Sequence, residues 1–243
     1  CRRDGMRILA IDDLADREHE CAVLLDQNLV EKMETRYRGL LPAACRQLLG
    51  PRYALLRPEF AEQRRCLSRR SGKIKRILIC FGGADPTNET LKALEAIKNP
   101  AMSQLTVDVV IGQSNPHAAA VEALCRSMIN VALHRGANNV ADLMRCADLA
   151  IGAGGVMSWE RCCLGLPAVT IGIADNQAEV LTALESVGAI MNIGPASSVT
   201  TEGIAQAMHS LLGNPEQVRL MSEISRSLVD GLGAERARSL ILC

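Results

Sequence analysis

The sequence predicts an α/β protein built around a parallel sheet. Short apolar runs rich in Ile and Val alternate along the 243 residues with amphipathic stretches of helical period. Small or polar loops follow several of these runs, as they do where parallel strands lead into helices. Because 48% of the residues are hydrophobic, the chain can bury a sizeable core.

The apolar runs and their flanking turn residues give the expected order of elements. The predicted strands are residues 7–11, 22–25, 77–80, 107–111, 131–134, 149–151, 168–171 and 190–192. The predicted helices are residues 87–98, 116–126, 140–145, 156–164, 176–187, 201–212 and 215–229. Pro86 precedes the first of these helices, and Gly165 and Gly188 close two others.

A basic segment divides the chain in two. Residues 64–76 hold seven basic residues and no acidic ones, with Ser71 and Gly72 in the middle. Such a segment is a solvated linker or an anion-binding patch, and we favour the linker. It separates a small first part, residues 1–72, from a second part, residues 73–243. Because the chain opens almost directly on a core strand, without Met at position 1, we expect a partial first sheet with an exposed edge.

Charge and composition disfavour several functional classes. The 27 basic residues balance 27 acidic ones, so nothing favours nucleic acid or an anionic membrane as a partner. The ten cysteines contain no CxxC pair, and five lie in apolar or amphipathic stretches, which favours reduced thiols in a cytoplasmic protein over disulfides or zinc. The longest apolar runs are shorter than the roughly 20 residues that a membrane-spanning helix needs.

Two loops that follow predicted strands carry glycines suited to a nucleotide. Gly82 and Gly83 let the backbone approach a ligand closely, although a plain tight turn explains them as well. Gly154 and Gly155 precede a helix whose first turn offers free amides and partial positive charge to a diphosphate. Glu160 follows about one turn later and could bind ribose hydroxyls, or simply complement the helix dipole.

A third loop follows the predicted strand at residues 168–171. Asp175 is suited to capping the next helix. The side-chain amides of Asn176 and Gln177 both donate and accept hydrogen bonds, which suits sugar hydroxyl, acetamido and phosphate groups. No Gly-Lys-Ser/Thr and no GxGxxG accompanies these loops, so neither a Walker loop nor a dinucleotide fingerprint is present.

In this order the motifs resemble those of the UDP-sugar hydrolases of pseudaminic acid biosynthesis. The matching segments span nearly the whole chain and are residues 11–13, 27–28, 49–60, 81–86, 153–155, 159–167 and 174–177. The resemblance implies a GT-B architecture, two Rossmann-like domains facing across a cleft, related to the glycosyltransferase that makes lipid II. It implies a C-terminal UDP-binding Rossmann-like domain at residues 73–243, with the remnant of an N-terminal Rossmann-like domain and a linker at residues 1–72.

The resemblance also implies an activity. Family members hydrolyse UDP-2,4-diacetamido-2,4,6-trideoxy-β-L-altropyranose to UDP and the free sugar, by inverting attack of water at the anomeric carbon. No cofactor and no essential metal are expected. We further expect a cytoplasmic monomer whose partner is the UDP-sugar substrate, without a nucleic-acid or membrane partner.

Individual roles follow from the same resemblance. Gly154 and Gly155 would hold the diphosphate and Glu160 the ribose. Asn176 would be the catalytic residue, with Gln177 beside it facing sugar and phosphates. Further expected contacts are Gly82 and Gly83 in the cleft and, as possible contacts, Asn28, Tyr37 and Ser158.

The chain departs from the family at its general base, which is a histidine in a Gly-His-x-x-x-Arg loop. This chain has no such loop. We expect His19 in a solvated turn, His134 in a structural or cleft-lining position, and His117 and His209 on the surface. Because general base assistance is worth ~10²–10⁴ in rate, the chain should be weakly active or inactive. The alternatives are a GT-B glycosyltransferase using a UDP-hexosamine donor and a non-catalytic UDP-binding remnant.

Overall fold

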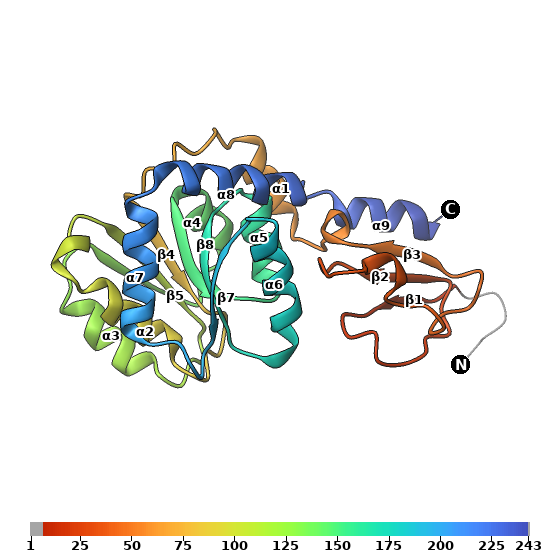
Figure 1. Cartoon of the computed structure of the whole chain (residues 1–243), viewed down its shortest axis with the longest axis horizontal. Coiled ribbons are helices and arrows are strands. Elements are labelled where there is room, and N and C mark those ends of the chain that lie inside the picture. Colours follow the sequence, from red (N-terminus) through yellow and green to blue (C-terminus); the bar gives the residue numbers. More distant parts are fainter. Residues whose placement is uncertain (1–6, 243) are drawn as a thin grey trace.

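The computed structural model describes residues 7–242, which form two parallel sheets joined by a helical segment (Figure 1). The smaller sheet has the order β1-β2-β3, with β1 at Leu9–Ile11, β2 at Val23–Asp26 and β3 at Arg46–Leu49. The larger sheet has the order β6-β5-β4-β7-β8-β9. Its strands are β4 (Arg76–Cys80), β5 (Thr106–Ile111), β6 (Val131–Arg135), β7 (Leu149–Ala153), β8 (Ala168–Gly172) and β9 (Met191–Pro195). All described strand pairs are parallel, which confirms the predicted fold class.

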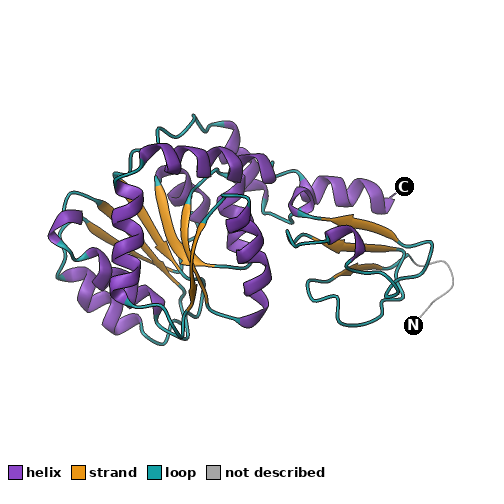
Figure 2. Ribbon diagram, viewed as in Figure 1, coloured by secondary structure: helices purple, strands orange, loops and turns teal. Residues whose placement is uncertain are grey.

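Helices cover both faces of the larger sheet (Figure 2). The α-helices are α1 (Pro58–Arg65), α2 (Glu89–Ile97), α3 (Ala118–Arg126), α4 (Val140–Cys146), α5 (Val156–Cys163), α6 (Ala178–Ser186), α7 (Thr201–Leu212), α8 (Pro215–Leu228) and α9 (Gly233–Leu242). Short 3₁₀ turns lie at η1 (Met33–Thr35), η2 (Pro51–Tyr53), η3 (Pro100–Met102) and η4 (Asp175–Gln177). None of the helices described between residues 7 and 242 has the length and apolar character to cross a membrane.

Alternation along the central strand explains the two cores. In β4, Ile77 and Ile79 pack with α2, α3 and α7, whereas Leu78 and Cys80 pack with α4, α5 and α6. Successive strand residues point to opposite faces, so a run that is apolar throughout is buried on both sides. This is why the short apolar runs were sufficient to predict the strands of the larger sheet.

Three elements were not predicted, namely β3, α1 and α9. Strand β3 buries only Leu48 fully, and α1 buries only Phe60. Neither segment therefore carries a clear apolar period. The predicted helix over residues 176–187 begins instead as the turn η4 before α6.

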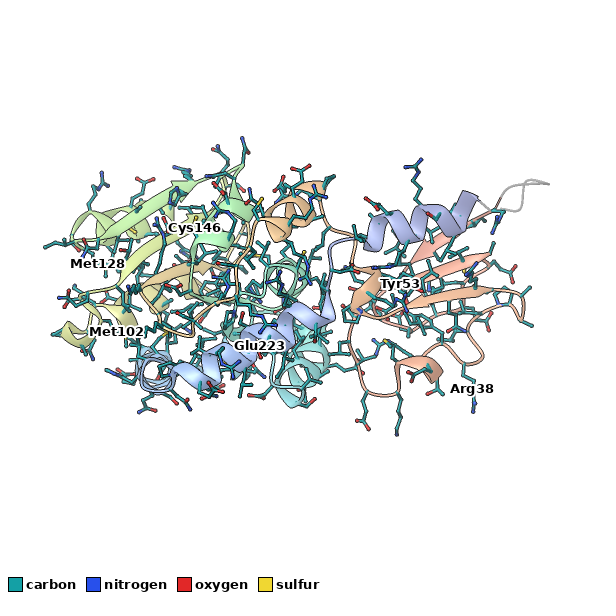
Figure 3. All side chains as sticks on the ribbon, turned by 90° about the horizontal axis from the view of Figure 1, so that it is seen from above. Arg38, Tyr53, Met102, Met128, Cys146 and Glu223 are labelled. Atoms are coloured by element: carbon teal, nitrogen blue, oxygen red, sulfur yellow. The ribbon has the colours of Figure 1, made fainter. Side chains whose placement is uncertain are left out.

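Helix α9, the last described helix, packs on the small sheet formed by the first part of the chain. Helix α9 packs through Ala237 on the small sheet, and Tyr53 of η2 lies beside this helix (Figure 3). The Arg236 guanidinium donates to the carbonyl of Arg52 at 2.8 Å. Residues at the C-terminal end of the chain thus complete the core of the first part, although the division at residue 72 stays a prediction.

The basic segment connects α1 to β4 without helix or strand over residues 66–75 and is largely exposed, but Arg64 and Arg70 anchor it to the rest of the chain. Arg64 donates to the carbonyls of Cys163 (2.6 Å) and Arg226 (2.9 Å). Arg70 donates to the carbonyls of Ala147 and, at 2.9 Å, Gly165. These guanidiniums satisfy carbonyls at or near helix C-termini, so they hold the segment against the larger sheet.

The small sheet has the exposed edge that was expected. Strand β1 pairs only with β2 within the described residues. The side chain of Ile11 on this strand is 60% exposed. An apolar strand edge of this kind can pair with another strand.

Candidate functional site

The loop after β4 is open where a ligand would approach. Gly82 has a φ of +88°, and apart from the adjacent residues no atom of the described chain lies within 4 Å of a Cβ built on either Gly82 or Gly83. On its other side the loop is tightly packed, since a Cβ on Gly112 would lie 2.1 Å from the Gly83 carbonyl oxygen. The sequence predicted Gly82 and Gly83 as site residues but not Gly112. A glycine is needed at position 112 only because the Gly83 backbone packs against it in the tertiary structure.

A cavity of about 210 Å³ adjoins this loop at the carboxyl ends of β4, β5 and β6. Its lining includes Arg57, Gly82, Gly83, Gly112, Gly136, Ala137, Met157 and Glu160. Backbone from three strand ends forms one wall, and the first turns of α5 form the other. The structure thus brings Gly82, Gly83 and Glu160 into one cavity.

Glu160 is partly desolvated within this cavity. Its side chain is 14% exposed, and its Oε1 lies 3.8 Å from the Nη2 of Arg57. Burial raises the pKa of the Glu160 carboxyl, while the positive charges of Arg57 and Arg161 oppose the shift. Arg57 itself lies over the ring of Phe60 at 5.4 Å, which orients its guanidinium. A carboxylate in this setting is a strong acceptor for hydroxyl donors.

The glycine loop before α5 lies against Gln177. Gly155 precedes the helix with a φ of +81°, and the structure shows no side chain capping this N-terminus. A Cβ on Gly154 would lie 3.0 Å from the Oε1 of Gln177. That oxygen accepts a hydrogen bond from the Ile173 amide at 3.1 Å, so Gln177 is fixed beside the loop. Gly154, Gly155 and Gln177 are therefore brought together.

A buried arginine that the sequence analysis missed supports the same loop. The Nη2 of Arg161 donates to the Ala153 carbonyl at 2.7 Å and to the Ser158 hydroxyl at 3.1 Å. Burial lowers the pKa of this guanidinium, and its Nε and Nη1 have no partner in the described part of the chain. The sequence feature that could have indicated Arg161 is its position directly before the apolar residues 162–164.

Two of the possible substrate contacts are corrected by their burial. Ser158 is buried, and its hydroxyl accepts from Arg161. Tyr37 is also buried, with its hydroxyl 3.0 Å from an oxygen of Asp12 and from an oxygen of Asp26. Burial, followed by the charge of Asp26, raises the pKa of this hydroxyl. Both side chains hold their neighbours in place and do not present a hydroxyl to a ligand.

The loop with Asn176 lies beside a second cavity. Asn176 is exposed on η4, between Asp175 and the fixed Gln177. The capping role considered for Asp175 is not observed, since among residues 7–242 no side chain caps η4 or α6. Asp175 instead lines a cavity of about 430 Å³ together with Thr87 and residues at the carboxyl ends of β8 and β9.

Arg36 connects this region to the small sheet. Its Nη1 donates to the Oε2 of Glu179 on α6 at 2.7 Å, and its Nε lies 3.4 Å from the Oδ2 of Asp26. The side chain of Asn28, the remaining possible contact, is half-buried, and its backbone amide donates to Asp26 at 2.9 Å. Arg36 was missed because its partner lies 143 residues away in the sequence.

The four histidines occupy other places. The expectation of a solvated turn for His19 is wrong, because its Nε2 lies 3.4 Å from the Oδ2 of buried Asp12 and the side chain is mostly covered. His134 is structural, with its Nε2 2.8 Å from Asp108. His117 lies 3.3 Å from the Pro86 carbonyl, and His209 is exposed on α7.

Comparison with known proteins confirms the predicted resemblance. No family model matches the chain. It is 27% identical over 184 residues to the UDP-2,4-diacetamido-2,4,6-trideoxy-beta-L-altropyranose hydrolase of Campylobacter jejuni, covering 76% of this chain and 64% of that protein. It is also 27% identical over 193 residues to the spore coat polysaccharide biosynthesis protein SpsG of Bacillus subtilis, covering 79% of this chain and 57% of that protein. The chain thus spans less than two thirds of the length of these relatives.

The solved structures agree in fold. MurG of Acinetobacter baumannii superposes with a TM-score of 0.63 at 17% identity, over 98% of this chain and 67% of that one. The fold is therefore GT-B-like, as the resemblance implied.

Proposed function

We propose that this chain binds the UDP moiety of a nucleotide sugar, as part of an enzyme that acts on that sugar. The observation that carries the proposal is that α5 adjoins a cavity along one side and has an uncapped N-terminus, within the described residues. The cavity with Glu160 lies on one side of this helix, and the open N-terminus with Gly154 and Gly155 lies at its start. A nucleoside in the cavity would therefore have its diphosphate at the helix N-terminus.

The local charges support a diphosphate at this place. Within the described residues no side chain caps the amides of the first turn of α5, and the helix dipole adds partial positive charge. Arg161 adds a buried guanidinium beneath the loop, with two nitrogen atoms unpartnered within the described residues. The hydroxyls of a ribose would meet the Glu160 carboxylate, whose side chain is only 14% exposed and therefore meets reduced competition from water.

For the sugar we propose the diacetamido-trideoxy-altropyranose that the resemblance implies. Gln177 lies against the glycine loop and Asn176 precedes it on η4, so the two side chains would contact the sugar and phosphates. Asn176 is the proposed catalytic residue of this chain. Water would attack the anomeric carbon with inversion, so that the C–O bond breaks and UDP leaves. This is the hydrolase reaction of pseudaminic acid biosynthesis, in which the general-base histidine is not supplied by this chain.

A glycosyltransferase with a UDP-hexosamine donor is the second candidate. The similarity to the Bacillus polysaccharide biosynthesis protein favours it, because that relative matches a similar share of the chain. The two reactions differ in their acceptor. Release of free sugar without any added acceptor supports the hydrolase, whereas turnover that requires a sugar or lipid acceptor supports the transferase.

Titration calorimetry of UDP into the chain tests nucleotide binding. We expect Glu160→Ala to weaken binding ~10-fold or more, because hydrogen bonds to a charged acceptor are lost. Glu95→Ala, an exposed position on α2 outside both cavities, is the matched control and should bind as the parent chain does. A folded parent chain that does not bind UDP would sink the proposal.

A further inference from the structure

Two thiols meet at the beginnings of the neighbouring strands β2 and β3. The Sγ of Cys21 lies 3.5 Å from the Sγ of Cys45. Cys45 immediately precedes β3 and Cys21 lies two residues before β2. The Arg46 amide donates to the Ala22 carbonyl at 3.0 Å, so the backbones that carry the two thiols are fixed side by side.

We propose that Cys21 and Cys45 form a redox modification site, which small-molecule disulfides convert to an intramolecular disulfide. The sulfur atoms need to approach by about 1.5 Å to reach a bond length of about 2.0 Å. The proposal requires that rotation of the two side chains supplies this movement while the strand pairing is kept. Among the eight cysteines that the structure describes, no second pair of thiols is hydrogen-bonded in this way.

The surroundings of the two thiols set the order of the chemistry. Cys45 is partly exposed, whereas Cys21 is only 7% exposed. Burial, together with the hydrogen bond to Cys45, raises the pKa of the Cys21 thiol to about 11. The small disulfide therefore reacts first at Cys45, because this thiol is the more exposed of the two.

The exchange balances in two steps. The Cys45 thiolate attacks one sulfur of the small disulfide, which forms a mixed disulfide and releases one small thiolate. Cys21, after losing its proton to solvent, attacks the Cys45 sulfur and releases the second small thiolate. Two protein thiols are oxidised and one small disulfide is reduced to two small thiols. The product ties together the two ends of residues 21–45.

This closed segment includes Arg36, whose guanidinium reaches Glu179 on the larger part of the molecule. It also includes Tyr37, which joins the buried carboxylates of the small sheet. Oxidation thus cross-links the two ends of the segment through which Arg36 contacts the larger part of the molecule. Because a cross-link removes chain entropy from the unfolded state, we expect the oxidised chain to be the more stable form.

A peptide map without reduction tests the site directly. Trypsin places Cys21 and Cys45 on different peptides, residues 18–32 and 39–46. After incubation of the folded chain with oxidised glutathione, we expect these two peptides to be linked by a disulfide. The exposed thiol of Cys66 reports on the oxidant, since it should carry glutathione in the same sample. Glutathione at Cys66 without linkage of the two peptides would overturn the proposal.

Thermal unfolding supplies a second readout that does not involve UDP. Oxidation should raise Tm by on the order of 5 °C. The rise should be lost in Cys45→Ser, which replaces one sulfur of a partly exposed side chain by oxygen, and kept in Cys66→Ser. An equal rise in Cys45→Ser would also refute the assignment, because the stabilisation would then come from another cysteine.

Discussion

Replacement of Arg36 should cost far more stability than replacement of its partner Glu179. Arg36 makes three contacts, to Glu179 (2.7 Å), to the carbonyl of Asp13 (3.0 Å) and to Asp26 (3.4 Å). Glu179 is 52% exposed, whereas Asp26 is 1% exposed. Losing the buried ion pair should therefore lower the free energy of unfolding more than losing the exposed one.

The magnitudes follow from this difference in exposure. The pair with half-exposed Glu179 contributes about 0.5 kcal/mol, because solvent screens it. The hydrogen bond to the Asp13 carbonyl contributes about 1 kcal/mol. Arg36→Met also leaves the Asp26 carboxylate buried without its cation, which costs about another 1 kcal/mol, since Tyr37 and the Asn28 amide remain as donors. We expect a total of about 2–3 kcal/mol for Arg36→Met and about 0.5 kcal/mol for Glu179→Gln.

Urea unfolding followed by far-ultraviolet circular dichroism measures both values. Arg36→Lys is the informative control, because it keeps a cation near Asp26 without the planar fork, and it should lose less than Arg36→Met. Equal losses in Arg36→Met and Glu179→Gln would refute the reasoning. They would show that the contact with Glu179, and not the buried carboxylate, determines the contribution of Arg36.

Three further predictions concern single side chains. Gly154→Ala should weaken UDP binding in calorimetry without unfolding the chain, because its Cβ would lie 3.0 Å from the Gln177 amide oxygen; unchanged affinity would argue against a diphosphate at this loop. The Arg236 guanidinium lowers the pKa of the Asp230 carboxyl to about 2 from 3.8, so the unfolded chain takes up the proton first and this stabilisation is present above about pH 4 and lost as pH falls toward 2. Asp230→Asn should therefore be less stable than the parent at pH 7, with a difference that shrinks as pH falls from about 4 through about 2; a difference independent of pH would contradict the assignment. Tyr37→Phe should lose about 1–3 kcal/mol in urea unfolding, because two buried carboxylates lose a donor; a neutral effect would mean that water replaces the hydroxyl.

Local pattern determined the fold class and the loops of the candidate site. The strands of the larger sheet are apolar along their whole length, because both of their faces are buried, and this pattern is visible without tertiary information. In parallel sheets the loops after strands gather at one edge. The glycines and amides that follow β4, β7 and β8 could therefore be predicted as neighbours, and the structure brings Gly154, Gly155 and Gln177 together.

Tertiary structure alone decided which side chains are accessible and which distant residues meet. Ser158 and Tyr37 have hydroxyls of suitable chemistry, but packing buries both and assigns them to Arg161 and to buried carboxylates. Arg36 meets Glu179 only because the two sheets are placed beside one another by segments such as α1, which has no strong apolar period. A linear pattern records which way a segment faces within its own element. It does not record which element will lie opposite, because that choice is made by the packing of the whole chain.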